Sequence, residues 1–200
     1  MIQIVKANKV KKNIKEEMSK LFVCSFFDVF RAICDNKEKL VKVFRHIFDM
    51  DCFYVVLLND EVVGMGAVSD GSSSINFNKF KFYRYFGLKK GKNIYNHLNN
   101  LLVERDYDFE MDEMCGMIEF LAVKEEYRNK KIGFTFVNHV MQDNKYIRYL
   151  ARVADNNHSA LALFENIGFE EFHKEEASEY EKKNLGVSNC LYMIYQKNSK

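Results

Sequence analysis

The part of the sequence best suited to chemistry is a basic loop between a predicted strand and a predicted helix. The loop spans residues 127–134, follows an apolar run at 118–123, and contains Arg128, Lys130 and Lys131. The first turn of a helix leaves backbone N–H groups unpaired and carries the positive end of the helix dipole, so it favours a bound anion. The three cations add charge that suits a pyrophosphate. The alternative is an ordinary strand-to-helix turn with solvated lysines.

A second segment, further along the chain, combines an apolar helix face with a terminating glycine. It reads Asn157-x-x-Ala160-x-x-Leu163-Phe164-Glu165-Asn166-x-Gly168-Phe169. Taken alone, this spacing indicates a buried helix face followed by a helix stop.

Together the two segments resemble the two signatures of the GNAT acetyltransferase superfamily. Arg128 and Gly133 stand at the outer positions of its acetyl-CoA motif, Arg/Gln-x-x-Gly-x-Gly/Ala, and one helix and one strand separate the two motifs. The resemblance covers residues 117–173 well, and the N-terminal half only in the order of its elements. It implies an acetyl-CoA-dependent N-acetyltransferase that uses acetyl-CoA as co-substrate. We expect no metal, because neither the cysteines nor the histidines show ligand spacing.

The resemblance also implies roles for particular residues. Two central strands would part after Leu121–Val123 and Val153, and the pantetheine arm would fill the gap like a missing strand. A backbone N–H near Leu121 would polarise the thioester carbonyl. Asn157 would bind the arm or the reacting groups, which makes it a catalytic candidate. The expected cofactor-binding residues are Leu121, Ala122, Val123, Arg128, Asn129, Lys130, Lys131, Ile132, Gly133, Phe134, Asn157 and Phe164.

Two residues depart from the family pattern. Lys131 stands where the motif usually has its first glycine, and we expect it in the first helical turn, because a positive φ there would cost ~1–2 kcal/mol. Phe164 stands where many members carry a tyrosine thought to protonate the departing thiolate, which Phe cannot do. A thiol of pKa ~8.5 leaves as thiolate at a cost of about 2 kcal/mol, so this acid is dispensable.

Proton removal from the acceptor matters more. An amine of pKa ~10.4 loses its proton at a cost of about 4–5 kcal/mol at pH 7, so a base or a water relay is needed. Glu119 is the candidate base, and strand alternation predicts that it lies on the same side as Leu121 and Val123. The alternative is a strand carboxylate that faces solvent or pairs with Arg148 or Arg152.

The elements predicted around these segments alternate between strands and helices. Strands are predicted at 2–5, 53–58, 62–68, 117–123, 147–153, 169–173 and 191–196, and helices at 13–34, 37–48, 94–102, 131–143 and 157–167. We expect an α/β (mixed α+β) fold: one GNAT-like domain over 1–200, with a mixed, mostly antiparallel sheet of about six or seven strands, splayed at its centre and flanked by helices on both faces. Its parts would be a helical insertion at about 75–115, an acetyl-CoA motif at 117–143 and a second motif at 147–173.

Composition and net charge limit the classes of partner that the sequence predicts. The hydrophobic fraction of 48% excludes a disordered chain, and a net charge of +2 gives no strong attraction to nucleic acid or membrane. Five scattered cysteines without a CxxC pair indicate structural roles rather than metal binding. The N-terminus lacks a signal-peptide layout, and the longest clean apolar run, Cys52–Leu58, is too short to cross a bilayer. We expect a cytoplasmic protein, compatible with a homodimer.

The acceptor is the least specified part. Acidic stretches at 106–113 and 175–181 would suit a cationic amine on a small molecule or peptide, unless they are merely solvated loops. Basic runs at 9–15 and 79–92 are expected to be helix faces rather than a nucleic-acid site. We expect direct attack by the amine in a ternary complex. The alternatives are a CoA-binding regulatory module that has lost catalysis, and an interaction protein, which would leave the motif pair unexplained.

Overall fold

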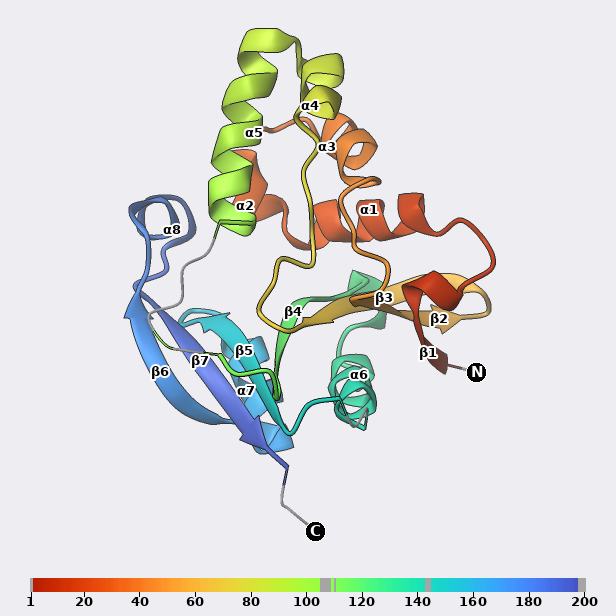
Figure 1. Cartoon of the computed structure of the whole chain (residues 1–200), viewed down its shortest axis with the longest axis vertical. Helices are drawn as coiled ribbons and strands as arrows, with labels where there is room; N and C mark the ends of the chain where they lie inside the picture. Colours follow the sequence, from red (N-terminus) through yellow and green to blue (C-terminus); the bar gives the residue numbers. More distant parts are fainter. Residues whose placement is uncertain (1, 105–108, 110, 143–144, 198–200) are drawn as a thin grey trace.

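The computed structural model describes residues 2–104, 109, 111–142 and 145–197 (Figure 1). Seven strands form one sheet in the order β1-β2-β3-β4-β5-β7-β6. The strands are β1 (Ile2–Lys6), β2 (Phe53–Leu58), β3 (Glu61–Ser69), β4 (Cys115–Val123), β5 (Arg148–Ala154), β6 (Glu170–Glu176) and β7 (Asn189–Gln196). β4 and β5 are parallel, and the other neighbouring strands are antiparallel. The predicted mixed, mostly antiparallel sheet is therefore confirmed.

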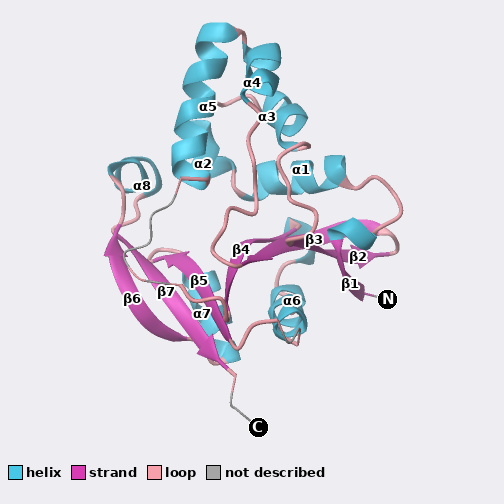
Figure 2. Cartoon of the chain, viewed as in Figure 1, coloured by secondary structure: helices cyan, strands magenta, loops and turns pink. Residues whose placement is uncertain are grey.

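Helices cover both faces of the sheet (Figure 2). They are α1 (Lys15–Ser25), α2 (Phe27–Arg31), α3 (Lys37–Phe44), α4 (Lys79–Phe86), α5 (Leu88–Leu102), α6 (Ile132–Met141), α7 (His158–Ile167) and α8 (Glu179–Leu185), with short 3-10 turns η1 (Ala7–Lys9) and η2 (Glu125–Tyr127). No helix in the described part of the chain is long and apolar enough to span a membrane.

Two apolar clusters lie on opposite faces of the sheet. Helices α1–α5 pack on one face through a phenylalanine-rich cluster that includes the fully buried Phe22, Phe44 and Phe53. Helices α6 and α7 pack on the other face, with Phe136 and Phe164 in their cluster. Aromatic side chains bury the most apolar area per residue, so these rings account for much of the stability of each layer.

The β2–β3 hairpin is formed as predicted, whereas two predicted helices have different bounds in the structure. The β2–β3 hairpin turns at Asn59-Asp60, whose φ angles of +49° and +64° are those of a tight two-residue turn. The helix predicted over 37–48 ends at Phe44. The helix predicted over 13–34 is broken at Phe26, which leaves the helical region with φ −111° and ψ 20° and divides α1 from α2.

Helix α4 was predicted only as part of a basic helix face at 79–92, without bounds of its own, and α8 was not predicted. The sequence of α4 is KFKFYRYF, in which aromatic and basic residues alternate and mask the helical period. The sequence of α8 is polar, but Ser178 and Glu181 form a capping box before it. That S-x-x-E pattern is a helix-start signal that could have revealed α8.

Candidate active site

The central parallel pair of strands comes apart. Pairing between β4 and β5 ends at Ile118 and Ala151, although β4 continues to Val123 and β5 to Ala154. Figure 1 shows the two strands diverging toward the helices of the α1–α5 layer and α8. The expected splay is present, but the strands part earlier than after Leu121–Val123 and Val153. Beyond the parting point, the β5-facing backbone of β4 lies outside the ladder and can bind an extended ligand.

A β-bulge in β4 begins next to the parting point. The register with β3 shifts so that Phe120 and Leu121 together oppose Gly66, and Phe120 takes a φ of +52°. A left-handed conformation costs a non-glycine residue ~1–2 kcal/mol. Ring contacts hold it in place, because the Phe120 ring lies 5.3 Å from Phe22 and stacks at 6.3 Å on Phe53.

Because of the bulge, Glu119 lies on the opposite face of the sheet from Leu121 and Val123. An inserted residue shifts the in–out alternation of a strand by one, so residues on either side of it no longer follow the period of two. Leu121 and Val123 pack into the α6–α7 cluster. Glu119 instead pairs across the ladder with Ala67, which belongs to the α1–α5 cluster. The prediction that Glu119 shares a side with Leu121 and Val123 is wrong.

Two buried hydroxyls hold the carboxylate of Glu119. Ser74 Oγ donates to Glu119 Oε2 at 2.9 Å, and Ser69 Oγ donates to the same oxygen at 3.3 Å. The serines are 1% and 2% exposed, whereas Glu119 is half-buried. Neither serine was predicted from the sequence, because one ends a strand and the other lies in a loop. The carboxylate thus stands at the parting point with one oxygen bound by fixed donors.

The basic loop is held against the end of β4. Arg128 Nε donates to the carbonyl of Val123 at 3.3 Å. Asn129 and Lys131 both have positive φ, at +60° and +59°. Lys131 is the N-cap of α6 and is left-handed, so the prediction that it lies in the first helical turn is wrong. The family's usual glycine would take this conformation without strain, whereas lysine carries the ~1–2 kcal/mol cost.

Helix α6 begins with open backbone donors. Among the described residues, no side chain caps its N-terminus. The first helical bond is from Thr135 N to Lys131 O at 2.9 Å, and the N–H groups of Ile132, Gly133 and Phe134 precede it. The helix itself supplies no partner for these donors, which are those an anion would bind.

Gly133 lets α6 approach its neighbours. A Cβ at this position would lie 3.2 Å from Leu163 Cδ2 of α7 and 3.9 Å from Leu121 Cδ2 of β4. The first contact is tighter than nine in ten real Cβ contacts, so a larger residue would require the Leu163 side chain to move by a few tenths of an ångström. Glycine thus allows α6 to start close to α7 and to the splayed end of β4.

This combination of a splayed parallel pair, a bulge and an uncapped helix agrees with the sequence comparison. The sequence matches the model of the acetyltransferase (GNAT) family over residues 15–169. The chain belongs to the GNAT family. No curated protein sequence matches it.

Solved structures share the GNAT fold at low identity. An N-acetyltransferase from Staphylococcus aureus Mu50 superposes with a TM-score of 0.69 at 16% identity, over 96% of this chain and 100% of the other. The ribosomal-protein-S18-alanine N-acetyltransferase from Escherichia coli gives 0.55 at 10% identity, over 100% of this chain and 96% of the other. At these identities the likeness concerns the fold.

The second GNAT motif is placed around α7. Asn157 is the N-cap of this helix, and its Oδ1 accepts from Ala160 N at 3.2 Å. Asn157 follows the C-terminal end of β5, and the basic loop follows the C-terminal end of β4. Because β4 and β5 are parallel, both lie at the same end of the two strands. Phe164 is 4% exposed and packs against Phe169 with ring centroids 4.9 Å apart. The structure therefore gives Asn157 a capping contact and Phe164 a core contact, and their predicted cofactor roles stay predictions.

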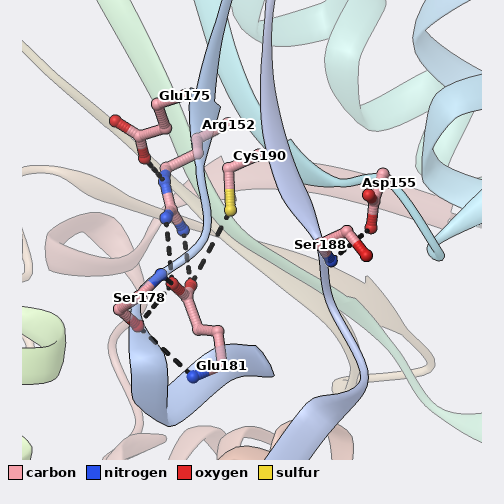
Figure 3. Close-up of polar contacts among 7 residues, drawn as sticks. All are labelled: Arg152, Asp155, Glu175, Ser178, Glu181, Ser188 and Cys190. Carbon is pink, nitrogen blue, oxygen red and sulfur yellow. Dashed lines mark hydrogen bonds and ion pairs between the residues drawn. The ribbon is translucent and has the colours of Figure 1, made fainter. Parts of the chain in front are cut away.

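Arg152 of β5 forms ion pairs with Glu175 of β6 and Glu181 of α8 (Figure 3). Its Nε donates to Glu175 at 2.7 Å and its Nη1 to Glu181 at 3.0 Å. Burial raises the pKa of Glu181, but hydrogen bonds from Arg152 and Ser178 outweigh it and hold that pKa at about 2. Burial raises the pKa of the Cys190 thiol to about 12, so it is neutral.

Ion pairs engage both strand arginines and the acidic stretch at 175–181. Arg152 binds Glu175 and Glu181, and Arg148 binds Asp112, so both arginines considered as partners of Glu119 are engaged elsewhere. In the acidic stretch at 175–181, the other two carboxylates pair with Lys182. Each carboxylate of the stretch therefore has a cationic partner within the protein, with four carboxylates sharing two cations. Residues 106–108 and 110 of the other acidic stretch lie outside the described residues.

Proposed function

We propose that this GNAT protein is an N-acetyltransferase that moves an acetyl group from acetyl-CoA to an amine by direct attack in a ternary complex. One observation carries the proposal: a single stretch of chain contains the parting of β4 from β5, the uncapped start of α6 and, directly after the parting point, Glu119. Each supplies a different need of the reaction, namely a slot for the donor, a site for its phosphates and a base.

The residues present fit acetyl-CoA. Its pyrophosphate matches the open N–H groups of Ile132, Gly133 and Phe134, with Arg128 and Lys130 close in sequence for added charge. The pantetheine arm, which carries amide groups, matches the β5-facing backbone of β4 beyond Ile118. Acetyl-CoA would supply an activated acetyl thioester. The chain would bind it, orient its carbonyl against a backbone N–H near Leu121 and handle the proton of the acceptor.

Glu119 is the proposed base, acting directly or through a water. Ser69 and Ser74 both donate to the same carboxylate oxygen, Oε2. These two bonds fix the orientation of the carboxylate and therefore the position of its second oxygen, Oε1. Holding the amine and thioester together supplies much of the rate by proximity. No side-chain acid is required for the departing thiolate, since its release costs only about 2 kcal/mol at neutral pH.

A catalytically inactive CoA-binding module is the second candidate, and Phe164 favours it because a phenyl ring cannot protonate a thiolate. The two functions separate in a two-step experiment. Acetyl-CoA at a hundredfold excess over its Kd should stabilise the fold by about 2.7 kcal/mol in a thermal-shift titration. An amine screen for thiol release should then find an acceptor. A thermal shift without thiol release for any amine supports the module, and no shift at millimolar acetyl-CoA contradicts both.

A further inference from the structure

One stretch of the chain carries cations and no carboxylates. Residues 71–103 contain no Asp or Glu but six of the chain's 30 Lys and Arg residues, namely Lys79, Lys81, Arg84, Lys89, Lys90 and Lys92. The rest of the chain therefore holds 24 cations against all 28 carboxylates. The modest net charge of +2 hides a strongly basic segment on an otherwise acidic protein, and such asymmetry attracts anionic partners.

The basic segment folds into α4 and α5, which project from the body of the molecule at the top of Figure 1. None of its six cations forms an ion pair with any residue that the structure describes. The same two helices carry the most exposed large apolar side chains of the described residues, Leu88 at 76% and Phe80 at 68%. Unpaired cations together with exposed apolar side chains are typical of a binding surface.

A groove of about 320 Å³ lies beside this surface, because Lys90 of α5 is among the residues that line it. It lies between α2, α5 and α8, and its lining includes Ile33, Lys90, Asn93, His97, Tyr180 and Asn184. Tyr180 Oη donates to the carbonyl of Val29 at 2.7 Å, which fixes α8 against α2. Arg152 binds Glu181 and so fixes the same helix to β5. The groove is thus walled by helices of the layer that covers Glu119 and by a helix anchored to the splayed strand.

We propose that the acceptor amine is carried by an acidic polypeptide segment, which lies in this groove with its carboxylates against the lysines of α4 and α5. The inference rests on the proposed function and specifies its substrate class. Charge complementarity is its main support, because the basic segment has no carboxylate of its own. The groove adds amide side chains, Asn93 and Asn184, that suit a peptide backbone, and an apolar wall at Ile33. A small free amine would need none of these contacts.

The test compares two peptides of equal length with the same free N-terminus and one lysine. In one peptide the other residues include Asp and Glu, and in the second these are replaced by Asn and Gln. Measured by thiol release from acetyl-CoA, kcat/KM should be about tenfold or more higher for the acidic peptide, and the ratio should fall as salt is raised. Equal values for the two peptides would overturn the inference and leave the proposed function standing. Absence of any effect of acetyl-CoA would instead remove the proposed function.

A variant series locates the contact. The exposed triple variant Lys89→Gln, Lys90→Gln, Lys92→Gln should reduce the acidic-to-neutral ratio to below about twofold. The matched control Lys9→Gln, Lys11→Gln, Lys15→Gln removes the same charge from another exposed basic run and should keep the ratio. Thermal shift with acetyl-CoA checks that each variant is folded. If the α5 variant keeps the peptide ratio but loses binding to single-stranded RNA or to phosphatidylserine vesicles, the surface serves another class of partner and the inference is wrong.

Discussion

The two faces of the sheet are built in different ways. On the α6–α7 face, the proposed cofactor site comes largely from one continuous segment, residues 121–134, in which a strand end, a loop and a helix start follow each other. On the α1–α5 face, Glu119 is held by Ser69 and Ser74, which lie 50 and 45 residues away in the sequence. The donor side is thus local and made largely of backbone, whereas the acceptor side is assembled from distant side chains. The first can be read from a motif, and the second depends on the fold.

The largest expected effect concerns the acceptor side. Glu119→Gln keeps the shape and the serine contacts but removes basicity, so the rate at neutral pH should fall about 10²–10⁴-fold with little change in acetyl-CoA affinity. The loss should shrink as pH approaches the pKa of the amine, because the free amine needs no base. A pH–rate profile of thiol release measures this, with exposed Glu171→Gln as control. A wild-type rate from pH 6 to 9 would make Glu119 a structural carboxylate.

The next effect tests the donor side. Arg128→Ala should weaken acetyl-CoA binding about 10–100-fold, the usual loss for one charge-assisted hydrogen bond to phosphate, measured by calorimetry. Acetyl-pantetheine, which lacks the pyrophosphate, should bind the variant and the wild type alike. Equal losses for both ligands would mean that Arg128 acts by holding the loop to Val123 rather than by binding phosphate.

A third effect concerns α8, which forms one wall of the groove proposed for the acceptor. The pKa of Glu181 is lowered from 4.5 to about 2, so its ionised form stabilises the fold fully above pH ~4.5, and this contribution is lost as pH falls toward 2. Urea unfolding should show Glu181→Gln less stable than wild type at pH 7 by about 2–3 kcal/mol, with the difference narrowing on acidification. Glu179→Gln removes an exposed carboxylate of the same helix and should show no such trend. Parallel pH profiles for wild type and Glu181→Gln would contradict the assigned pairing.

The smallest expected effect concerns Lys131 in the basic loop. Lys131→Gly relieves the left-handed strain of ~1–2 kcal/mol but adds chain entropy to the unfolded state. Stability to urea should therefore rise by less than about 1 kcal/mol. Acetyl-CoA affinity should fall a fewfold through the lost charge. Exposed Lys130→Gly, where φ is not positive, should lower stability instead. A destabilised Lys131→Gly variant would mean that the φ of +59° carries no strain.

What the sequence could predict follows the same division. The strand–loop–helix segment and the Asn59-Asp60 hairpin were predictable, because a few adjacent residues determine each of them. The facing of Glu119 was not, because the bulge at Phe120 depends on the register with β3 and on a cluster of distant rings. The conformation of Lys131 was mispredicted because its residue type argues against positive φ, whereas the loop requires it. Helix α8 carries a capping signal but no apolar period.

The most direct test of the account is to locate acetyl-CoA by hydrogen–deuterium exchange of the wild-type protein with and without this ligand. Bound acetyl-CoA should slow amide exchange across residues 119–134, where β4 leaves β5 and α6 begins. Exchange in α4 and α5, at 79–102, should stay unchanged, because these helices are proposed to bind only the acceptor. Slowed exchange confined to α1–α5, with 119–134 unaffected, would contradict the proposed donor site and with it the division of labour between the two faces.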